Sequence, residues 1–184
     1  MKILNLSPDT PEWKAWRLTV ISGTDAASIM GVNPYCSLKK LRQKKLGLLP
    51  EEEMNQFMLR GKNLEGEARD KFNQSECMDM VPLIVESTEY PFLGVSLDGI
   101  SSCRKYILEI KCPQKKSMDE AKAGIVKPLY IAQIQAQLLV TGADMCYYYC
   151  YDGIENHMIK VYPDKEWQEE YLPKAEEFWM SLVF

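Results

Sequence analysis

Residues 94–113 read GVSLDGISSCRKYILEIKCP, and this stretch decides the fold. Residues 94–97 alternate apolar with small or polar side chains, a pattern typical of a strand. Asp98 and Gly99 are expected to begin a turn, because glycine supplies backbone freedom there. Residues 106–110 are rich in side chains that favour strands. The stretch therefore predicts two strands joined as a hairpin.

Charged side chains of this hairpin are expected to gather at one end of it. Side chains alternate along a strand with period two, so Glu109 and Lys111 share a face, and strand pairing brings Asp98 beside them. Two carboxylates and a lysine suit a divalent metal and a phosphate, and hard oxygen ligands suit magnesium. The alternative is a solvated strand whose ion pair contributes little. The strand is mostly apolar, however, and an unneeded charge there costs stability, which favours the functional interpretation.

Composition places the chain among globular proteins. It has 184 residues, 46% of them apolar and 26% charged, which is enough for one domain with a good core. No repeat or linker interrupts it, so residues 1–184 are expected to form a single domain. A net charge of −4 gives no general attraction to DNA, so a DNA-binding surface has to be local. The basic run at residues 37–46 is the best candidate, although such runs are usually solvated faces.

The expected compartment is the cytoplasm. Six cysteines occur without a CxxC pair, which argues against a zinc site and for reduced thiols. No apolar run approaches a membrane span, and the first residues lack a charged segment followed by an apolar one. The lone His157 lies outside every motif, so no Ser-His-Asp or Cys-His set rivals the acids.

Two helices are expected before residue 31. The first follows Thr10-Pro11, a capping residue and a proline in the first turn, and carries tryptophans at helical spacing that are best explained as core. Ser22-Gly23-Thr24 then enters a short helix, capped by Thr24 or Asp25. Free N–H groups and hydroxyls at such a place can face a phosphate. The plainer interpretation is a helix cap.

A long helix is expected from residue 50 to about residue 73. Leu64, Ala68 and Phe72 form an apolar stripe on it. Glu65 flanks the stripe with Arg69 as its i+4 partner, so a surface ion pair is the simplest role for Glu65.

A further helix is expected from Pro128 through residue 140, with a glycine just past its end. Gln133, Gln135 and Gln137 alternate inside this apolar helix. Tyr130, Gln133 and Gln137 share one side of it. A glutamine packed on a sheet needs a partner, and a ligand or a water can be one.

The other elements complete an α/β prediction. A strand at residues 81–86, a helix at 117–123, a hairpin over 144–162 and a closing helix at 164–182 are expected. Together they predict a central mixed sheet flanked by helices. Strand order does not follow from the sequence.

With these motifs in place, the chain resembles the phage lambda exonuclease, or YqaJ-type viral recombinase, family within the PD-(D/E)xK nuclease superfamily. The resemblance covers about residues 12–162. It rests on five ordered motifs: Trp13-x-x-Trp16-Arg17-(x)4-Ser22-Gly23-Thr24-Asp25, Arg60-Gly61-Lys62-x-x-Glu65-x-x-Ala68-Arg69, Ser96-Leu97-Asp98-Gly99, Leu108-Glu109-Ile110-Lys111-Cys112-Pro113 and Tyr130-x-x-Gln133-x-Gln135. Leu97 stands where the superfamily usually has proline before the first acid.

The resemblance implies a restriction-endonuclease-like fold and a role for each matched residue. Asp98 and Glu109 are implied to hold the metal together with the Ile110 carbonyl, and Lys111 to position the attacking water. Glu65 is implied to complete the acidic cluster, which replaces the surface-pair interpretation, and Gln133 to lie beside the reaction centre. The implied pocket for a terminal 5′-phosphate consists of Arg17, Ser22 and Thr24.

The resemblance also implies an activity. The family degrades one strand of linear duplex DNA in the 5′→3′ direction with Mg²⁺, for which Mn²⁺ is expected to substitute. It acts with a single-strand annealing protein in phage-type recombination, in a bacterial host cell from a phage or prophage gene, and several members are homotrimers. The alternatives are an endonuclease of the same superfamily, for restriction or repair, and a catalytically inactive DNA-binding protein on this fold.

Overall fold

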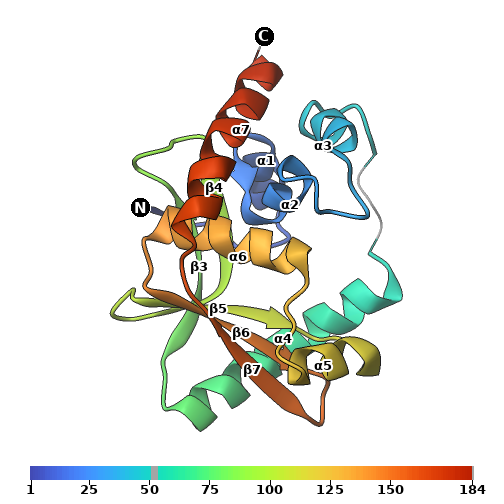
Figure 1. Ribbon diagram of the computed structural model, residues 1–184, viewed down its shortest axis with the longest axis vertical. Coiled ribbons are helices and arrows are strands. Elements are labelled where there is room, and N and C mark those ends of the chain that lie inside the picture. The colour runs from blue at the N-terminus through green and yellow to red at the C-terminus, as the bar shows by residue number, and fades with distance from the viewer. Residues whose placement is uncertain (51–53, 184) are drawn as a thin grey trace.

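The computed structural model describes residues 1–50 and 54–183. Figure 1 shows a twisted sheet with helices on both of its faces. The sheet has seven strands in the order β1-β3-β4-β5-β6-β7, and β2 pairs with β4 off this path. The strands are β1 (Lys2–Leu4), β2 (Ile21–Ser22), β3 (Met80–Glu86), β4 (Leu93–Ser101), β5 (Tyr106–Lys111), β6 (Met145–Tyr151) and β7 (Asn156–Val161).

The sheet is mixed, as predicted. β3, β4 and β5 follow one another antiparallel, whereas β5 and β6 run parallel and β7 returns antiparallel to β6. Parallel neighbours need a crossover connection. Here the crossover contains α5 (Lys115–Lys122) and α6 (Pro128–Thr141).

The central hairpin is confirmed, but its predicted turn is wrong. β4 runs through Asp98 and Gly99, and Gly99 pairs with Leu108. Residues 102–105 make the connection instead, with Arg104 at φ 59°. Gly99 is required for close packing, because a Cβ there would lie 2.9 Å from the Cβ of Met80. The glycine therefore marks a crowded strand interior.

The two faces of the sheet carry different helices. α6 packs with α2 (Ala26–Ile29) and α7 (Lys165–Val183) on one face, over the larger core cluster that contains Ile107. α4 (Gln56–Glu76) covers the other face, where Ala68 and Phe72 meet Leu108. The predicted apolar stripe of α4 is confirmed. Alternation along β5 consequently turns Glu109 away from α4 and toward α6.

Several helix boundaries differ from the predicted ones. α4 begins at Gln56, where the Asn55 side chain accepts hydrogen bonds from the next turn, and it runs on to Glu76. The acids expected at its start, residues 51–53, lie outside the described residues. α1 (Pro11–Leu18) has the expected cap at Thr10, and α3 (Leu38–Lys45) follows the predicted basic run.

The short helix after α1 differs from the prediction. It consists of a single 3₁₀ turn, η1 (Gly23–Asp25), with Ser22 at its N-cap, followed by α2. Asp25 stands at the N-cap position of α2, as one of the two predicted residues, but its side chain makes no capping hydrogen bond there. Along the described ranges, no helix combines the length and the apolarity needed to cross a bilayer.

Candidate active site

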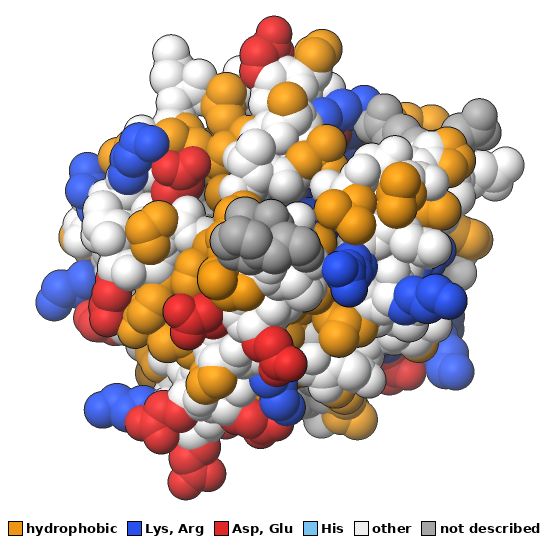
Figure 2. All heavy atoms as spheres, turned by 90° about the horizontal axis from the view of Figure 1, so that it is seen from above, with side chains coloured by type: hydrophobic (Ala, Val, Ile, Leu, Met, Phe, Trp, Pro, Cys, Tyr) orange, Lys and Arg blue, Asp and Glu red, His pale blue; other side chains and the backbone are white. Residues whose placement is uncertain are grey.

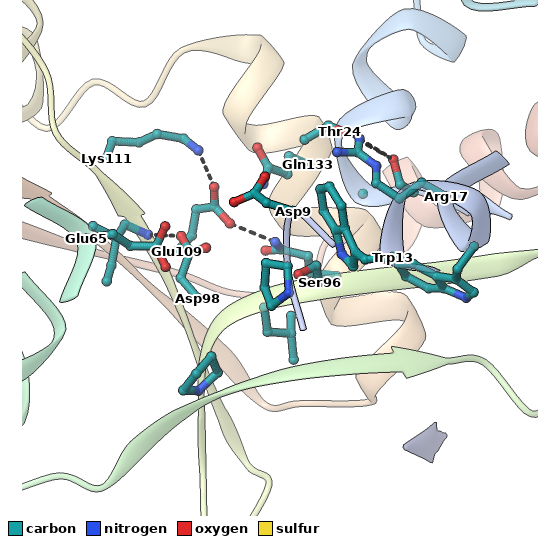
Figure 3. Close-up of a pocket in the computed structure, with 18 residues that line it drawn as sticks. Asp9, Trp13, Arg17, Thr24, Glu65, Ser96, Asp98, Glu109, Lys111 and Gln133 are labelled. Carbon is teal, nitrogen blue, oxygen red and sulfur yellow. Dashed lines mark hydrogen bonds and ion pairs between the residues drawn. The ribbon is translucent and has the colours of Figure 1, made fainter. Parts of the chain in front are cut away.

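One cavity of about 270 Å³ collects every predicted site residue. It lies between the middle of β4, the end of β5, the middle of α6 and the segment from α1 to η1 (Figure 3). Its lining includes Arg17, Ser22, Thr24, Glu65, Asp98, Glu109, Ile110, Lys111 and Gln133. Residues far apart in the sequence thus line one cavity.

The hairpin places the two acids side by side. The Ile110 N–H donates to Asp98 Oδ2 at 2.7 Å, which ties the carboxylate of β4 to the backbone of β5. Burial and the neighbouring Glu109 raise the pKa of Asp98 well above its usual value, although Lys111 opposes this. The crowding of negative charge at this point is what a cation would relieve.

Glu109 is fixed by partners on both sides. Its side chain is only 1% exposed and forms an ion pair with Lys111 through Oε1. Its Oε2 accepts a hydrogen bond of 2.7 Å from Gln137 Nε2. Burial alone would lower the pKa of Lys111, but Glu109 and Asp98 raise it, so Lys111 remains a cation. The shared face predicted for Glu109 and Lys111 is confirmed.

Glu65 both faces the cavity and has an ion-pair partner. It lines the cavity, and it also forms the predicted i+4 ion pair with Arg69 at 2.5 Å. Arg69 Nε in addition donates to the Asp98 carbonyl at 2.5 Å. The pair therefore links α4 to the part of β4 that carries Asp98.

Gln137 is the site residue that sequence reasoning missed. Gln133 lines the cavity, yet Gln137, one turn later on the same side of α6, makes the contact with Glu109. Gln137 is 1% exposed, and its Oε1 has no hydrogen-bond partner within the described part of the chain. Gln135 is structural, since it bonds the Tyr162 carbonyl and the Asp164 N–H at 2.8 Å each. The signal was present, because buried glutamines require partners.

Arg17, Ser22 and Thr24 form a second polar group in the same cavity. Arg17 Nη2 donates to Thr24 Oγ1 at 2.8 Å and to Ser22 Oγ at 3.2 Å (Figure 3). The expected free backbone donors are not all there, because the Ser22 N–H already donates to Asp25 Oδ2 at 2.7 Å. The side chains of Arg17 and Thr24 make this group suitable for an anion.

Lys45 does not belong to an exposed basic surface, contrary to the expectation for residues 37–46. Its side chain is 5% exposed and pairs with Asp25 at 2.7 Å. Burial would raise the pKa of Asp25, but Lys45 and Arg17 hold it below its usual value. A run of charged residues in the sequence does not show which of their side chains is buried.

The acidic end of the cavity has donors that fit a magnesium ion. Asp98 and Glu109 supply carboxylate oxygens, and the Ile110 carbonyl lies on the same strand end. Magnesium is commonly held by one or two carboxylates, with waters and substrate phosphate as the other ligands. In the portion of the chain that the structure describes, no three acidic, His or Cys side chains form a ligand set on their own.

Comparisons with known proteins show the family of this chain. Residues 12–144 match the family described as the YqaJ-like viral recombinase domain. The chain belongs to this family. No curated protein matches the sequence.

Solved structures of similar fold include LHK-Exo, an alkaline exonuclease from Laribacter hongkongensis. It is 25% identical with a TM-score of 0.82, over 95% of this chain and 93% of that chain. The complex of LHK-Exo with dAMP gives 24% identity and a TM-score of 0.84 over the same shares. A phage-related exonuclease from Haemophilus somnus 129PT shares the fold at 15% identity and a TM-score of 0.69, over 93% of this chain and 98% of that chain. The predicted fold class is confirmed.

Proposed function

We propose that this YqaJ-family chain is a magnesium-dependent exonuclease that degrades one strand of linear duplex DNA in the 5′→3′ direction. The observation that carries the proposal is the single cavity lined by both the Asp98–Glu109–Lys111 group and the Arg17–Thr24 group. The family and the likeness to an alkaline exonuclease support a nuclease of the phage-recombination type. A single-strand annealing protein is the partner we propose.

In this proposal Asp98, Glu109 and the Ile110 carbonyl hold Mg²⁺, for which Mn²⁺ substitutes. The ion supplies Lewis-acid stabilisation of the phosphoryl oxygens and lowers the pKa of a bound water. Lys111 keeps its proton beside Glu109 and places a positive charge near the reacting phosphate. Glu65 adds negative charge at the rim of the cavity, and Gln133 is available for contact with the substrate.

Arg17 and Thr24 bind the terminal 5′-phosphate. A phosphate monoester carries more charge than an internal diester, and the planar guanidinium of Arg17 offers several donors to it. Each hydrolysis exposes a new 5′-phosphate, which can occupy the same place. Preference for ends and the 5′→3′ direction both follow from this arrangement.

The test is digestion of end-labelled linear duplex with magnesium, comparing 5′-phosphate with 5′-hydroxyl ends. We expect faster loss of the phosphorylated strand, no loss with a chelator, and none in Asp98→Ala or Glu109→Ala. Substantial activity in either folded variant would contradict the site. Cleavage of closed circular plasmid would indicate an endonuclease instead, and DNA binding without cleavage would indicate an inactive binding protein.

Arg17→Ala tests the end pocket directly. Loss of a charge-assisted contact costs about 1.5–3 kcal/mol. The ratio of digestion rates for 5′-phosphate over 5′-hydroxyl ends should therefore fall roughly ten- to a hundredfold. Lys165→Ala is the matched control, because Lys165 is an exposed cation at the start of α7. If folded Arg17→Ala keeps the full preference, the phosphate binds elsewhere.

A further inference from the structure

We propose that Asp25 and Lys45 are positioning residues for the end pocket, the group formed by Arg17, Ser22 and Thr24. They hold the Ser22 hydroxyl proton in a hydrogen bond to Asp25, which leaves Arg17 and Thr24 as the donors to the terminal phosphate. This inference rests on the proposed function and adds which groups of the pocket recognise the 5′-phosphate. Neither residue touches the proposed substrate. Both act through the side chains that do.

Lys45 has no donor left for a ligand. It reaches from the last turn of α3 and donates to the Arg17 and Val20 carbonyls at 2.6 Å each. Its ammonium group lies 2.7 Å from Asp25 Oδ2. An ammonium group carries three protons, and these acceptors account for all of them. Lys45 therefore fixes the backbone that leads from α1 into β2, together with the Asp25 carboxylate, and does not contact DNA.

Asp25 determines the direction of the Ser22 hydroxyl. Asp25 Oδ2 lies 2.7 Å from the Ser22 N and 2.7 Å from Ser22 Oγ. Lys45 and Arg17 hold the pKa of Asp25 below its usual value against the effect of burial, so the carboxylate can only accept. Ser22 has a single hydroxyl proton, and that proton points at Asp25. The oxygen of Ser22 can then only accept, as it does from Arg17 Nη2 at 3.2 Å.

Thr24 is left as the hydroxyl that can donate. Its Oγ1 accepts from Arg17 at 2.8 Å and lies 3.1 Å from Ser22 Oγ. The proton of Ser22 is committed to Asp25, so in that contact Thr24 has to be the donor. Rotation of the Thr24 hydroxyl redirects its proton to a phosphate oxygen, whereas Ser22 presents only lone pairs, which repel one.

Charge gives Lys45 a second role. The carboxylate of Asp25 is one hydrogen bond away from Ser22 and two from Arg17, in a partly buried site where charges are weakly screened. An unbalanced negative charge there would oppose a phosphate in the same cavity. Lys45 cancels it, so the net positive charge of Arg17 is available to the DNA end.

The experiment measures affinity without cleavage. A short duplex with a 5′-phosphate and the same duplex with a 5′-hydroxyl are titrated in chelator by fluorescence anisotropy. Thermal melting of each variant is recorded alongside. The variants are Lys45→Met, the double variant Asp25→Asn with Lys45→Met, Ser22→Ala and Thr24→Val, with Lys165→Ala as control.

In Lys45→Met we expect the ratio of affinities for 5′-phosphate over 5′-hydroxyl duplex to fall about tenfold, the size of effect expected for a lost charge-assisted contact. The double variant should regain most of it, because the uncompensated charge is gone while the carbonyl oxygen of the introduced amide can still accept. Thr24→Val should lose clearly more of the preference than Ser22→Ala. A purely structural pair would lower the melting temperature of both Lys45 variants without restoring preference in the double one.

The outcomes separate the two proposals. If the native protein itself shows no preference for 5′-phosphate, the proposed end pocket fails and this inference fails with it. If the native preference is present but Lys45→Met retains it, only the role of Lys45 is overturned. If Lys45→Met does not fold, the hydroxyl pair decides: equal losses in Ser22→Ala and Thr24→Val overturn the inference, and the expected inequality supports it.

Discussion

At the scale of single residues, the geometry of the site depends on which hydrogen-bond partners its buried polar atoms have. Glu109 Oε1 is used by Lys111 and Oε2 by Gln137, so the carboxylate cannot turn freely. Each carboxylate oxygen still has a lone pair for another ligand. In the proposed function, a fixed carboxylate next to Asp98 lowers the reorganisation needed when a cation and a phosphate bind.

Lys111→Ala is expected to reduce turnover by about 10²- to 10³-fold, the range for removing one positioned charge-stabilising group. DNA binding should weaken much less, because Lys111 is engaged with Glu109 before substrate arrives. Single-turnover cleavage and filter binding measure the two effects separately. Equal losses in binding and in cleavage per bound complex would make Lys111 a simple phosphate contact.

Gln137→Leu should change activity and stability by different amounts. The leucine removes the hydrogen bond that orients Glu109, so we expect turnover to fall by about tenfold, as for a net contribution of about 1.4 kcal/mol. It also removes a buried Oε1 that has no partner among the described residues. This gain offsets the loss of the donor to the buried Glu109 Oε2, so the unfolding free energy should change little.

Gln135→Leu is the matched control on the same helix. It breaks bonds to Tyr162 and Asp164, so it should lower stability and leave turnover per folded molecule nearly unchanged. Urea denaturation and single-turnover assays check both variants. Full activity in Gln137→Leu would remove Gln137 from the site.

At the scale of elements, periodic patterns in the sequence predicted correctly which face of a helix or strand is buried. Features without a period, such as very short strands and a single glycine, were predicted poorly. The stripe of α4 and the alternation in β5 gave the correct faces because they repeat over several turns or residues. β1 and β2 were missed, since strands as short as Ile21–Ser22 have no period to recognise. The turn assigned to Gly99 failed because packing against Met80, rather than chain reversal, requires that glycine.

The same reasoning applies to the candidate site. The predicted residues line one cavity, because the elements that carry them meet there. Which of the glutamines on α6 meets Glu109, and which lysine of α3 turns inward, depends on the rotation of each helix against its neighbours. A single sequence does not contain that rotation.

The contact between α3 and η1 should appear in the pH dependence of stability. The pKa of Asp25 is lowered in the folded protein by Lys45 and Arg17, against burial. A lowered pKa contributes stability that is present above the unfolded value of about 4 and is lost as pH falls through the folded value. The native protein should therefore be more stable than Asp25→Asn at neutral pH, and the difference should shrink below about pH 4.

Urea denaturation of both proteins across this pH range measures that difference. Lys165→Ala, at the start of α7, serves as the comparison for a general loss of charge. A stability difference that stays constant to the lowest pH would mean that Asp25 contributes through packing alone.

At the scale of the whole molecule, charge works against DNA binding. The protein itself has a net charge of −4, and its proposed substrate is an anionic polymer. Figure 2 shows cations, acids and apolar side chains interspersed on the face around the end of α7, rather than one continuous basic surface. With Lys45 turned inward, α3 offers less positive charge than its sequence suggests. Attraction to DNA therefore depends on local groups near the cavity, and repeating them around a closed ring would multiply their effect.

We therefore propose a closed homo-oligomer, with the trimer itself suggested by the family resemblance. Exposed apolar side chains between α3 and the first turns of α4 are available for such an interface: Leu46, Leu48, Met54, Phe57 and Met58. Light scattering coupled to size exclusion should give three times the chain mass of 21.2 kDa at micromolar concentration. A monomer would contradict the ring, and the protein should then release DNA after few cleavages.

A ring that encloses the duplex also predicts how digestion proceeds. Enclosure keeps the DNA end near the cavity between successive cleavages, so the local concentration of the end stays high whatever other DNA is in solution. Digestion of a labelled duplex, started before excess unlabelled competitor is added, should therefore continue to completion. Competitor that stops digestion at once would show that the protein is not held around its substrate.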